Sequence, residues 1–384
     1  MFLHTIASLS VDRGGTSRCV SELCGGIAST GADVGILTTA DSSAAPGKFL
    51  PPGKSCAVVE SDDKGVLGRF GLPFYAKLND RLRSQQVELI HDHGVWLVTN
   101  YMAARLAYKY GVPLAISTHG MVEPWSLAQS ATKKKIAFSI YQRGVFKRAS
   151  VFFATSEAEA FNIRQLGLKQ PIAVIPNGVA IPESISLSKE TRQNSERIIL
   201  FLSRVHKKKG LINLARAWAN IREPGWRLVI AGNDESGHKE EVLSVIRGLG
   251  IGQWFDFIGP VHGKDKEDIY LNADVFILPT FSENFGVVIA EALSYGVPVI
   301  TTTGTPWKSL VKSNSGWWVK PDVEHITAAI REAISMTDGE RSDMGLNGRK
   351  HVIDNYSWTS VVSGTLSVYS WLLGQSERPD CVIS

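Results

Sequence analysis

Residues 274–293 read DVFILPTFSENFGVVIAEAL, and their pattern of apolar and polar residues indicates the fold class. A short apolar run, Asp274–Leu278, is followed by a polar loop that contains a proline and a glycine, and then by an apolar helical segment. Short apolar strands that alternate with helix-length segments are typical of βαβ units, in which the strands are parallel. The stretch therefore predicts an α/β protein built on parallel sheets.

The same alternation runs through the chain in two halves. We expect the strands of a first sheet at Phe2–Ser8, Asp33–Thr38, Val87–His91, Pro113–Thr118, Val151–Thr155 and Ile172–Ile175. We expect those of a second sheet at Ile198–Ser203, Arg227–Ala231, Trp254–Ile258, Asp274–Leu278 and Val297–Thr301. Each set predicts a doubly wound, Rossmann-like domain.

A polar stretch separates the two halves. Between Pro176 and Arg197 the alternation stops, and the residues are mostly Ser, Asn and charged side chains, as is typical of a linker. We therefore predict an N-terminal domain over residues 1–190 and a C-terminal domain over 191–355. Apolar residues at helical spacing within 356–384 predict a last helix, which we expect to pack back on the first domain.

The composition excludes several classes of protein. Of 384 residues, 44% are apolar and 20% charged, the balance of a globular protein with sizeable cores. A net charge of +4 does not indicate a nucleic-acid partner. The four cysteines are scattered, without the spacing of a disulfide framework or a metal site, which favours the cytoplasm. No apolar run approaches the ~20 residues of a spanning helix, so we expect only peripheral membrane contact.

Two strand-to-helix loops have features of a phosphate site. The first contains the pair Gly14–Gly15, which allows backbone N–H groups to approach an anion at a helix N-terminus. A plain tight turn is the alternative, and the GxGxxG pattern of a nicotinamide site is missing. The second, Ser203–Leu211, carries four cationic side chains and a glycine, and it predicts a diphosphate clamp. A solvated basic turn is the alternative here.

Glu291 lies inside the apolar helical segment that follows Glu283, and none of its one-turn neighbours is a cation. A buried glutamate without a partner is costly, so this one either reaches solvent or hydrogen-bonds a ligand. The polar loop beside it favours the ligand.

Polar and aromatic side chains follow two strands of the first half: His91, His93 and Trp96 after one, and His119, Glu123 and Trp125 after the next. Three histidines at such edges can indicate a metal, but no HExxH pattern or Cys/His spacing accompanies them. We therefore expect no metal and interpret these residues as polar contacts to sugar hydroxyls. Residues 132–148 combine basic and apolar side chains, and such a helix either lies on an anionic bilayer or packs on its apolar side with its basic side in water.

Together these motifs resemble those of glycosyltransferase family 4, the retaining group with the GT-B fold, over nearly the whole chain. The likeness is carried by Gly14–Gly15, Ile175–Val179, the spacing from Arg204 to Lys209–Gly210, and the Glu283–Glu291 element. The resemblance implies two Rossmann-like domains that face a central cleft. The segment His119–Trp125 further resembles a subgroup found in bacterial polysaccharide, lipopolysaccharide and O-antigen assembly.

The resemblance also implies residue roles. A GDP- or UDP-linked sugar donor would bind the second domain, with Glu291 on the ribose hydroxyls. Arg204 and Lys209 would neutralise the diphosphate; the tract of three lysines leaves the clamp lysine open, and spacing favours Lys209. Glu283 would meet the sugar and phosphate, and His119 would contact the sugar near the reacting carbon. Further donor contacts would come from Gly14, Gly15, Asn177, Asn284, Phe285, Gly286 and Val287, and acceptor contacts from His91, His93, Trp96, Glu123 and Trp125.

We therefore expect a metal-independent, retaining hexosyltransferase without a cofactor, acting on a saccharide acceptor, lipid-linked at the inner membrane, in bacterial surface polysaccharide synthesis. The motifs do not distinguish GDP from UDP donors. A GT-B protein that binds nucleotide sugars without transfer is an alternative, as is a nucleotide-sugar epimerase. A phosphorylase would need free phosphate, and the missing glycine fingerprint disfavours a dehydrogenase.

Overall fold

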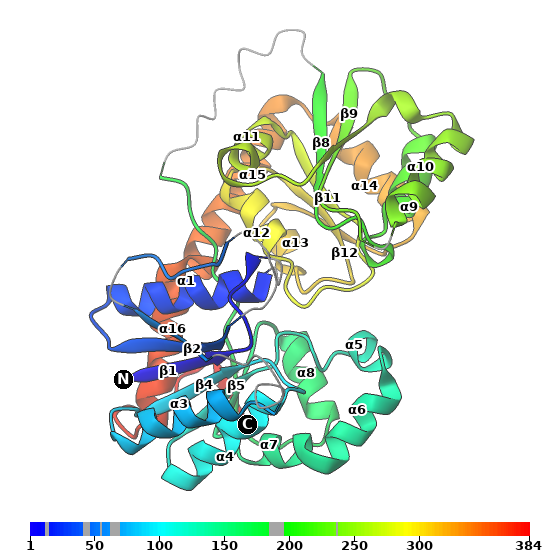
Figure 1. Ribbon diagram of the computed structural model, residues 1–384. Coiled ribbons are helices and arrows are strands. Elements are labelled where there is room, and N and C mark those ends of the chain that lie inside the picture. The colour runs from blue at the N-terminus through cyan, green and yellow to red at the C-terminus, as the bar shows by residue number, and fades with distance from the viewer. Residues whose placement is uncertain (12–14, 41–46, 54–55, 62–69, 184–195, 236) are drawn as a thin grey trace. The chain divides into compact units, whose positions relative to one another are not determined.

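The chain forms two compact α/β units, which are drawn in Figure 1. Unit 1 comprises Met1–Gly178 and Trp358–Ser384, and unit 2 comprises Val179–Ser357. The first segment of unit 1 therefore ends at Gly178, before residue 190, where we placed the boundary. The computed structural model describes residues 1–11, 15–40, 47–53, 56–61, 70–183, 196–235 and 237–384.

Unit 1 is built on an eight-stranded sheet with the order β14-β7-β6-β5-β4-β1-β2-β3. All neighbours pair in parallel except β14, which is antiparallel to β7. The strands are β1 (Phe2–Ile6), β2 (Val34–Thr39), β3 (Ala57–Ser61), β4 (Leu89–His93), β5 (Leu114–Ser117), β6 (Val151–Ala154), β7 (Ile172–Val174) and β14 (Val382–Ile383).

Helices cover both faces of this sheet, and α1 packs against α16 on one of them. The helices are α1 (Gly15–Ser29), α3 (Leu72–Arg83), α4 (Val98–Tyr110), α5 (Pro124–Ala128), α6 (Ala131–Ala137), the π-helix η2 (Phe138–Gln142), α7 (Arg143–Lys147), α8 (Glu157–Gln165) and α16 (Trp358–Leu372). Because strand side chains alternate between faces, Leu89 belongs to the core under α1 and α16, whereas Ile90 belongs to the core under α3 and α4. His91 and His93 therefore point to the α1–α16 face.

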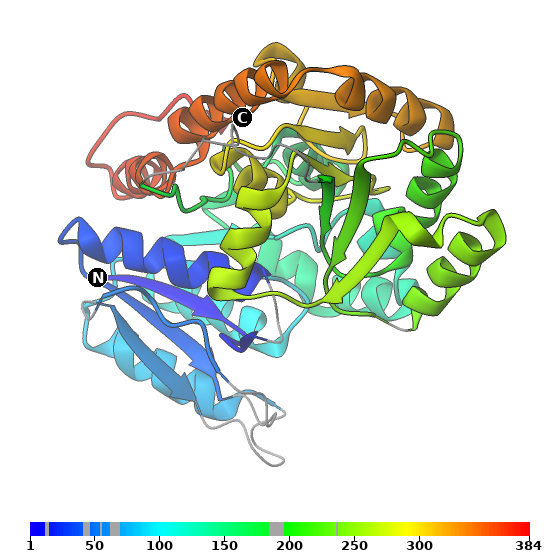
Figure 2. The ribbon, with the colours of Figure 1, turned by 90° about the horizontal axis from the view of Figure 1, so that it is seen from above.

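Unit 2 has a parallel six-stranded sheet with the order β10-β9-β8-β11-β12-β13. Its strands are β8 (Arg197–Leu202), β9 (Trp226–Ala231), β10 (Phe255–Gly259), β11 (Val275–Leu278), β12 (Val299–Thr302) and β13 (Gly316–Val319). Its helices are η4 (Lys207–Lys209), α9 (Leu211–Ala219), α10 (His238–Leu249), η5 (Gly252–Trp254), α11 (Gly263–Asn272), α12 (Val287–Ser294), α13 (Ser309–Lys312), α14 (Val323–Ser335) and α15 (Asp338–Tyr356). In Figure 2 the orange helices α14 and α15 follow one another along one side of the unit.

The predicted alternation of strands and helices is confirmed in both units, with local differences. Strand β4 continues past the predicted end at His91 to His93, because His91 and His93 are buried like apolar residues of a parallel sheet. The strands β3, β13 and β14 were not predicted; β14 has only two residues, and its pairing with β7 depends on the return of the chain after α16. Among the described residues, no helix has both the length and the apolar character needed to cross a bilayer.

Candidate functional site

In unit 2, two loops that follow neighbouring strands are tied together. Strands β8 and β11 are paired, so the loops after them leave the same edge of the sheet. The backbone N–H of Phe281 donates to the carbonyl of Lys208 at 2.8 Å, and Thr280 Oγ1 donates to the same carbonyl at 2.9 Å. The basic turn and the loop before α12 therefore form one structure.

A buried ion pair joins these loops. Lys209 Nζ lies 2.5 Å from Glu283 Oε1, and the two side chains are only 9% and 14% exposed. Thr280 Oγ1 also lies 3.0 Å from Glu283 Oε1, and the Glu283 N–H donates to the carbonyl of Gly304 at 2.7 Å. Because both charges are withdrawn from most of the solvent, their attraction is weakly screened and their geometry is fixed.

Gly210, after the lysine tract, allows this close approach. Its φ is +73°, and a Cβ at this position would lie 2.0 Å from the carbonyl oxygen of Pro279. Only glycine combines this left-handed conformation with such contact between the two loops. The glycine of the basic turn is therefore explained by packing, and it is also the N-cap residue of α9.

Glu291 is buried on α12 and has two partners on α11. Lys266 Nζ lies 2.7 Å from the carboxylate, and Tyr270 Oη donates to Glu291 Oε2 at 3.0 Å. The sequence indicated no cation on the same helix, and the structure supplies one from another helix. Lys266 and Tyr270 were missed, because nothing in the sequence spacing links α11 to α12.

Arg204 is not part of this pair. Its guanidinium bonds Glu235 Oε2 at 2.7 Å, and the two side chains are 62% and 41% exposed. Of the cations in the basic turn, Lys209 is the buried one, whereas Lys207 pairs with Glu241 at an exposed position. The structure thus separates the predicted clamp residues Arg204 and Lys209 into two ion pairs.

Among the described residues, no side chain caps the start of α12. Its N-cap is Gly286, with φ +80° and no capping side chain, and Val287 is the first helical residue. Asn284 Oδ1 is buried and has no hydrogen-bond partner among the described residues. Phe285, in contrast, is a core residue that packs against Trp307 and Tyr356, and Trp307 Nε1 donates to its carbonyl, so its side chain is not presented to a ligand.

In unit 1, a buried carboxylate shapes the loop that holds His119. Glu159 accepts hydrogen bonds from Thr118 Oγ1 and the Gly120 N–H, both at 2.6 Å, and from the N–H and Oγ1 of Thr155. These bonds hold His119 at φ +48°, a backbone conformation that is unfavourable for residues other than glycine. Glu159 was missed; the Ser156-x-x-Glu159 pattern, which resembles a capping box, is the signal that could have identified it.

His119 borders a small cavity of about 40 Å³. The wall also includes Asn177 and the rings of His91 and His93, all within unit 1. This volume holds water but not a sugar. His91 and His93 are 1% and 4% exposed and bond to other protein side chains, so the structure gives them an internal position rather than the surface position expected of acceptor ligands.

The other predicted residues of unit 1 differ in exposure. Trp96 is half-buried at φ +80°, and its Nε1 donates to the carbonyl of Met121. Glu123 is buried and precedes α5, whereas Trp125 on α5 is 45% exposed. Gly15 begins α1 with open space around it, and Gly14 lies outside the described residues.

Comparison with known families matches both halves of the chain. The model for "Glycosyl transferase 4-like domain" matches residues 14–178, and that for "Glycosyl transferases group 1" matches residues 184–351.

Similar proteins span most of the chain. An uncharacterized glycosyltransferase of Methanocaldococcus jannaschii is 30% identical over 302 residues, which are 73% of this chain and 75% of the relative. D-inositol 3-phosphate glycosyltransferase 2 of Catenulispora acidiphila is 27% identical over 94% of this chain and 90% of its own length. The solved structure of sucrose-phosphate synthase from Thermosynechococcus elongatus superposes with a TM-score of 0.80, at 19% identity, over 98% of this chain and 100% of that one.

Proposed function

Since the chain belongs to the glycosyl transferases of group 1 and is therefore a transferase, we propose that it moves a hexose-type sugar from a GDP- or UDP-linked donor to a saccharide acceptor, with retention of configuration. The observation that carries this proposal is the buried Lys209–Glu283 pair at the joined loops of unit 2.

The donor site follows from what each group of unit 2 can bind. Lys209 has three N–H donors and spends one on Glu283, so the others can meet phosphate oxygens. The uncapped start of α12 adds backbone N–H groups with partial positive charge. Glu291 has both oxygens held by α11 and keeps lone pairs for the two ribose hydroxyls. Asn284 Oδ1 is a buried acceptor that a sugar hydroxyl would satisfy.

The chemistry requires stabilisation of the departing nucleoside diphosphate. Negative charge grows on the phosphate as the glycosidic bond breaks, and preorganised donors lower the barrier most when they face that charge. Lys209 and the α12 N-terminus would supply this without a metal. We assign His119 to the transferred sugar, and we propose that the acceptor hydroxyl attacks from the face that the diphosphate leaves and gives its proton to a phosphate oxygen.

The acceptor proposal rests on the surface of α6 and η2. Ile136 and Ile140 are 55% and 76% exposed, and Lys133, Lys135 and Arg143 are exposed close to them in sequence. Exposed apolar side chains next to cations suit an anionic bilayer. We therefore propose peripheral binding at the cytoplasmic membrane and a lipid-linked saccharide acceptor of bacterial surface polysaccharide or O-antigen synthesis.

A transfer assay tests the function. Purified protein is incubated with labelled GDP- and UDP-linked sugars, in EDTA, with a lipid-linked saccharide or with a soluble phosphorylated acceptor of the kind that the Catenulispora relative is named for. We expect label in the lipid fraction with one donor class, with the α-configured donor giving an α-linked product. Release of an epimerised free sugar without acceptor, or activity that only magnesium restores, would contradict the proposal.

A further inference from the structure

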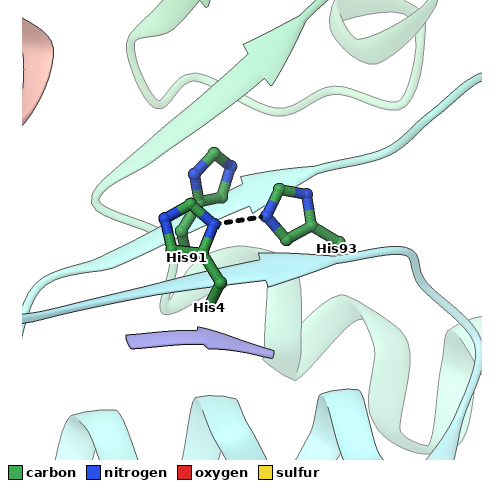
Figure 3. Close-up of side chains that lie close together, drawn as sticks. All are labelled: His4, His91 and His93. Carbon is green, nitrogen blue, oxygen red and sulfur yellow. Dashed lines mark hydrogen bonds between the residues drawn. The ribbon is translucent and has the colours of Figure 1, made fainter. Parts of the chain in front are cut away.

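Beneath His119, a chain of buried side chains is linked by hydrogen bonds from ring to ring. His4 Nδ1 lies 2.9 Å from His93 Nε2, and His93 Nδ1 lies 3.0 Å from His119 Nε2. Figure 3 shows His4, His91 and His93 in close-up, with the bond between His4 and His93 dashed. These histidines come from β1 and β4, two paired strands, and their side chains share the α1–α16 face of the sheet.

The chain continues away from His119 through a tyrosine of α16. Tyr369 Oη lies 3.3 Å from His4 Nε2 and 2.6 Å from His91 Nδ1. His91 Nε2 in turn lies 2.8 Å from Ser117 Oγ. Every ring nitrogen of His4, His91 and His93 therefore has a protein partner.

The rings are neutral, so each one has a single N–H and a single lone pair. Burial lowers the pKa of His4 to about 3, and it lowers the pKa of His91 and His93 well below the usual value. Burial also raises the pKa of Tyr369, which keeps the phenol protonated. In such a chain the direction of one hydrogen bond fixes the direction of all the others.

The distances around Tyr369 indicate that direction. Hydroxyl donors form shorter hydrogen bonds than N–H donors. The 2.6 Å contact is therefore the Tyr369 O–H donating to His91 Nδ1, and the 3.3 Å contact is the His4 Nε2–H donating to Tyr369. His91 then donates from Nε2 to Ser117, whose own hydroxyl can turn to the water-sized cavity that it lines.

The same direction continues to the loop. His93 donates from Nε2 to His4, and His119 donates from Nε2 to His93. We propose that Tyr369, His4 and His93 are positioning residues that hold His119 in the Nε2–H tautomer, so that its Nδ1 lone pair accepts a hydrogen bond from a hydroxyl of the bound sugar. This inference rests on the proposed function for the identity of the ligand. A phosphate oxygen cannot donate to this lone pair, whereas a sugar hydroxyl can.

The same three histidines have the composition of a metal site, since one ligand atom from each lies within 4.8 Å of the others. The hydrogen bonds favour the chain over an ion. With every ring nitrogen of these three histidines paired to a protein group, the cluster is satisfied without a metal, and an ion would have to break several of these bonds.

Histidine tautomers in solution test the chain directly. Two-bond ¹H–¹⁵N spectra of the protein distinguish Nδ1–H from Nε2–H, and we expect Nε2–H at His4, His93 and His119. In Tyr369→Phe, the His4 Nε2–H loses its acceptor, and an orphaned buried donor is rarer than an orphaned acceptor. The chain should then reverse, and the Nδ1–H fraction at His119 should rise. Tyr110→Phe is the control, because it removes a hydroxyl that bonds Asn79 at 2.8 Å, away from the chain.

Three results would overturn the inference. They are Nδ1–H at His119 in the wild-type protein, an unchanged His119 tautomer in folded Tyr369→Phe, and stoichiometric zinc binding that His4→Gln abolishes. In the transfer assay, Tyr369→Phe should be slower by about tenfold, the loss of one hydrogen bond, while Tyr110→Phe should keep wild-type turnover. Wild-type transfer by His119→Ala would remove the sugar contact from the proposed function, whereas the spectra would still decide whether the chain exists.

Discussion

Lys209 and Glu283 form an ion pair of 2.5 Å between loops that follow two adjacent strands, and Thr280 Oγ1 lies 3.0 Å from the same carboxylate oxygen. The pair is neutral as a whole. A diphosphate that arrives beside it therefore meets an ammonium group already fixed in place, together with a carboxylate that repels it. Because the ammonium group attracts the diphosphate and the carboxylate repels it, substitutions of Lys209 and of Glu283 should have different effects on nucleotide binding.

Glu283→Gln should separate binding from transfer. The change removes the negative charge and retains a hydrogen-bond acceptor, so nucleoside diphosphate should bind at least as tightly as to the wild-type protein. Transfer should fall by about 10² or more, because Glu283 is assigned to the sugar. Turnover and affinity measured on one preparation check this, and unchanged turnover would remove Glu283 from the reaction.

Glu291→Gln should weaken nucleotide binding without affecting phosphate binding. The carboxylate, held by Lys266 and Tyr270, is assigned to the ribose, and a charged acceptor binds hydroxyls more strongly than an amide does. We expect about tenfold weaker binding of UDP or GDP and unchanged competition by inorganic pyrophosphate. Lys266→Met should give the same pattern, because the carboxylate loses the cation that orients it. Equal losses for pyrophosphate and nucleotide would contradict the ribose assignment.

Ile140→Ser tests the membrane surface. Ile140 is 76% exposed next to several cations, and its removal should reduce sedimentation with vesicles that contain anionic lipid. Ile353→Ser, the same change at an exposed position on α15, is the control and should sediment as the wild-type protein does. If the protein does not sediment with such vesicles at low salt, the peripheral membrane proposal is wrong.

The buried histidines should make the protein sensitive to acid. Between pH 6.5 and about pH 3 the unfolded chain binds a proton at His4 that the folded chain does not, so stability falls as the pH drops through this window. His91 and His93 act in the same direction. Each of them can lower the unfolding free energy by at most about 1.4 kcal/mol per pH unit. Burial raises the pKa of Asp92 to about 6, so between pH 6 and pH 3.8 the folded chain binds a proton at Asp92 that the unfolded chain does not. Asp92 therefore offsets part of the effect of the histidines in this range.

Urea unfolding at several pH values measures this dependence. The unfolding free energy of the wild-type protein should decrease from pH 6.5 to pH 5, and His4→Gln should show a shallower slope from a lower starting value. A wild-type stability that is constant over this range would show that the buried rings are not kept neutral.

The sequence predicted the fold and the strand ends at which the loops of the candidate site lie, because both depend on local pattern. The apolar run Asp274–Leu278 and the polar loop after it specify a strand end, and strand ends of a parallel sheet carry ligand sites. Glu283, Glu291 and Lys209 were therefore predicted at one edge of unit 2. The ion pairs that the charged side chains of these loops form were not predicted. Arg204 was expected beside Lys209 at the diphosphate, but it pairs with Glu235.

The missed residues act through tertiary contacts. Lys266 reaches Glu291 from another helix, and Glu159 reaches the His119 loop from α8. His4 lies in an apolar strand, where a single histidine gives no sign of its partners. Its neighbours come from β4 and α16, which are distant in sequence, so only the packed sheet and helix reveal the chain.

Titration calorimetry with UDP and GDP measures whether Lys209 holds the donor diphosphate. Lys350→Met, at an exposed position on α15, is the matched control for Lys209→Met. We predict that the wild-type protein and Lys350→Met bind one of the two nucleotides equally well, and that Lys209→Met binds it at least about tenfold more weakly, the loss of one charge-assisted hydrogen bond. Wild-type affinity in folded Lys209→Met would show that Lys209 does not hold the diphosphate.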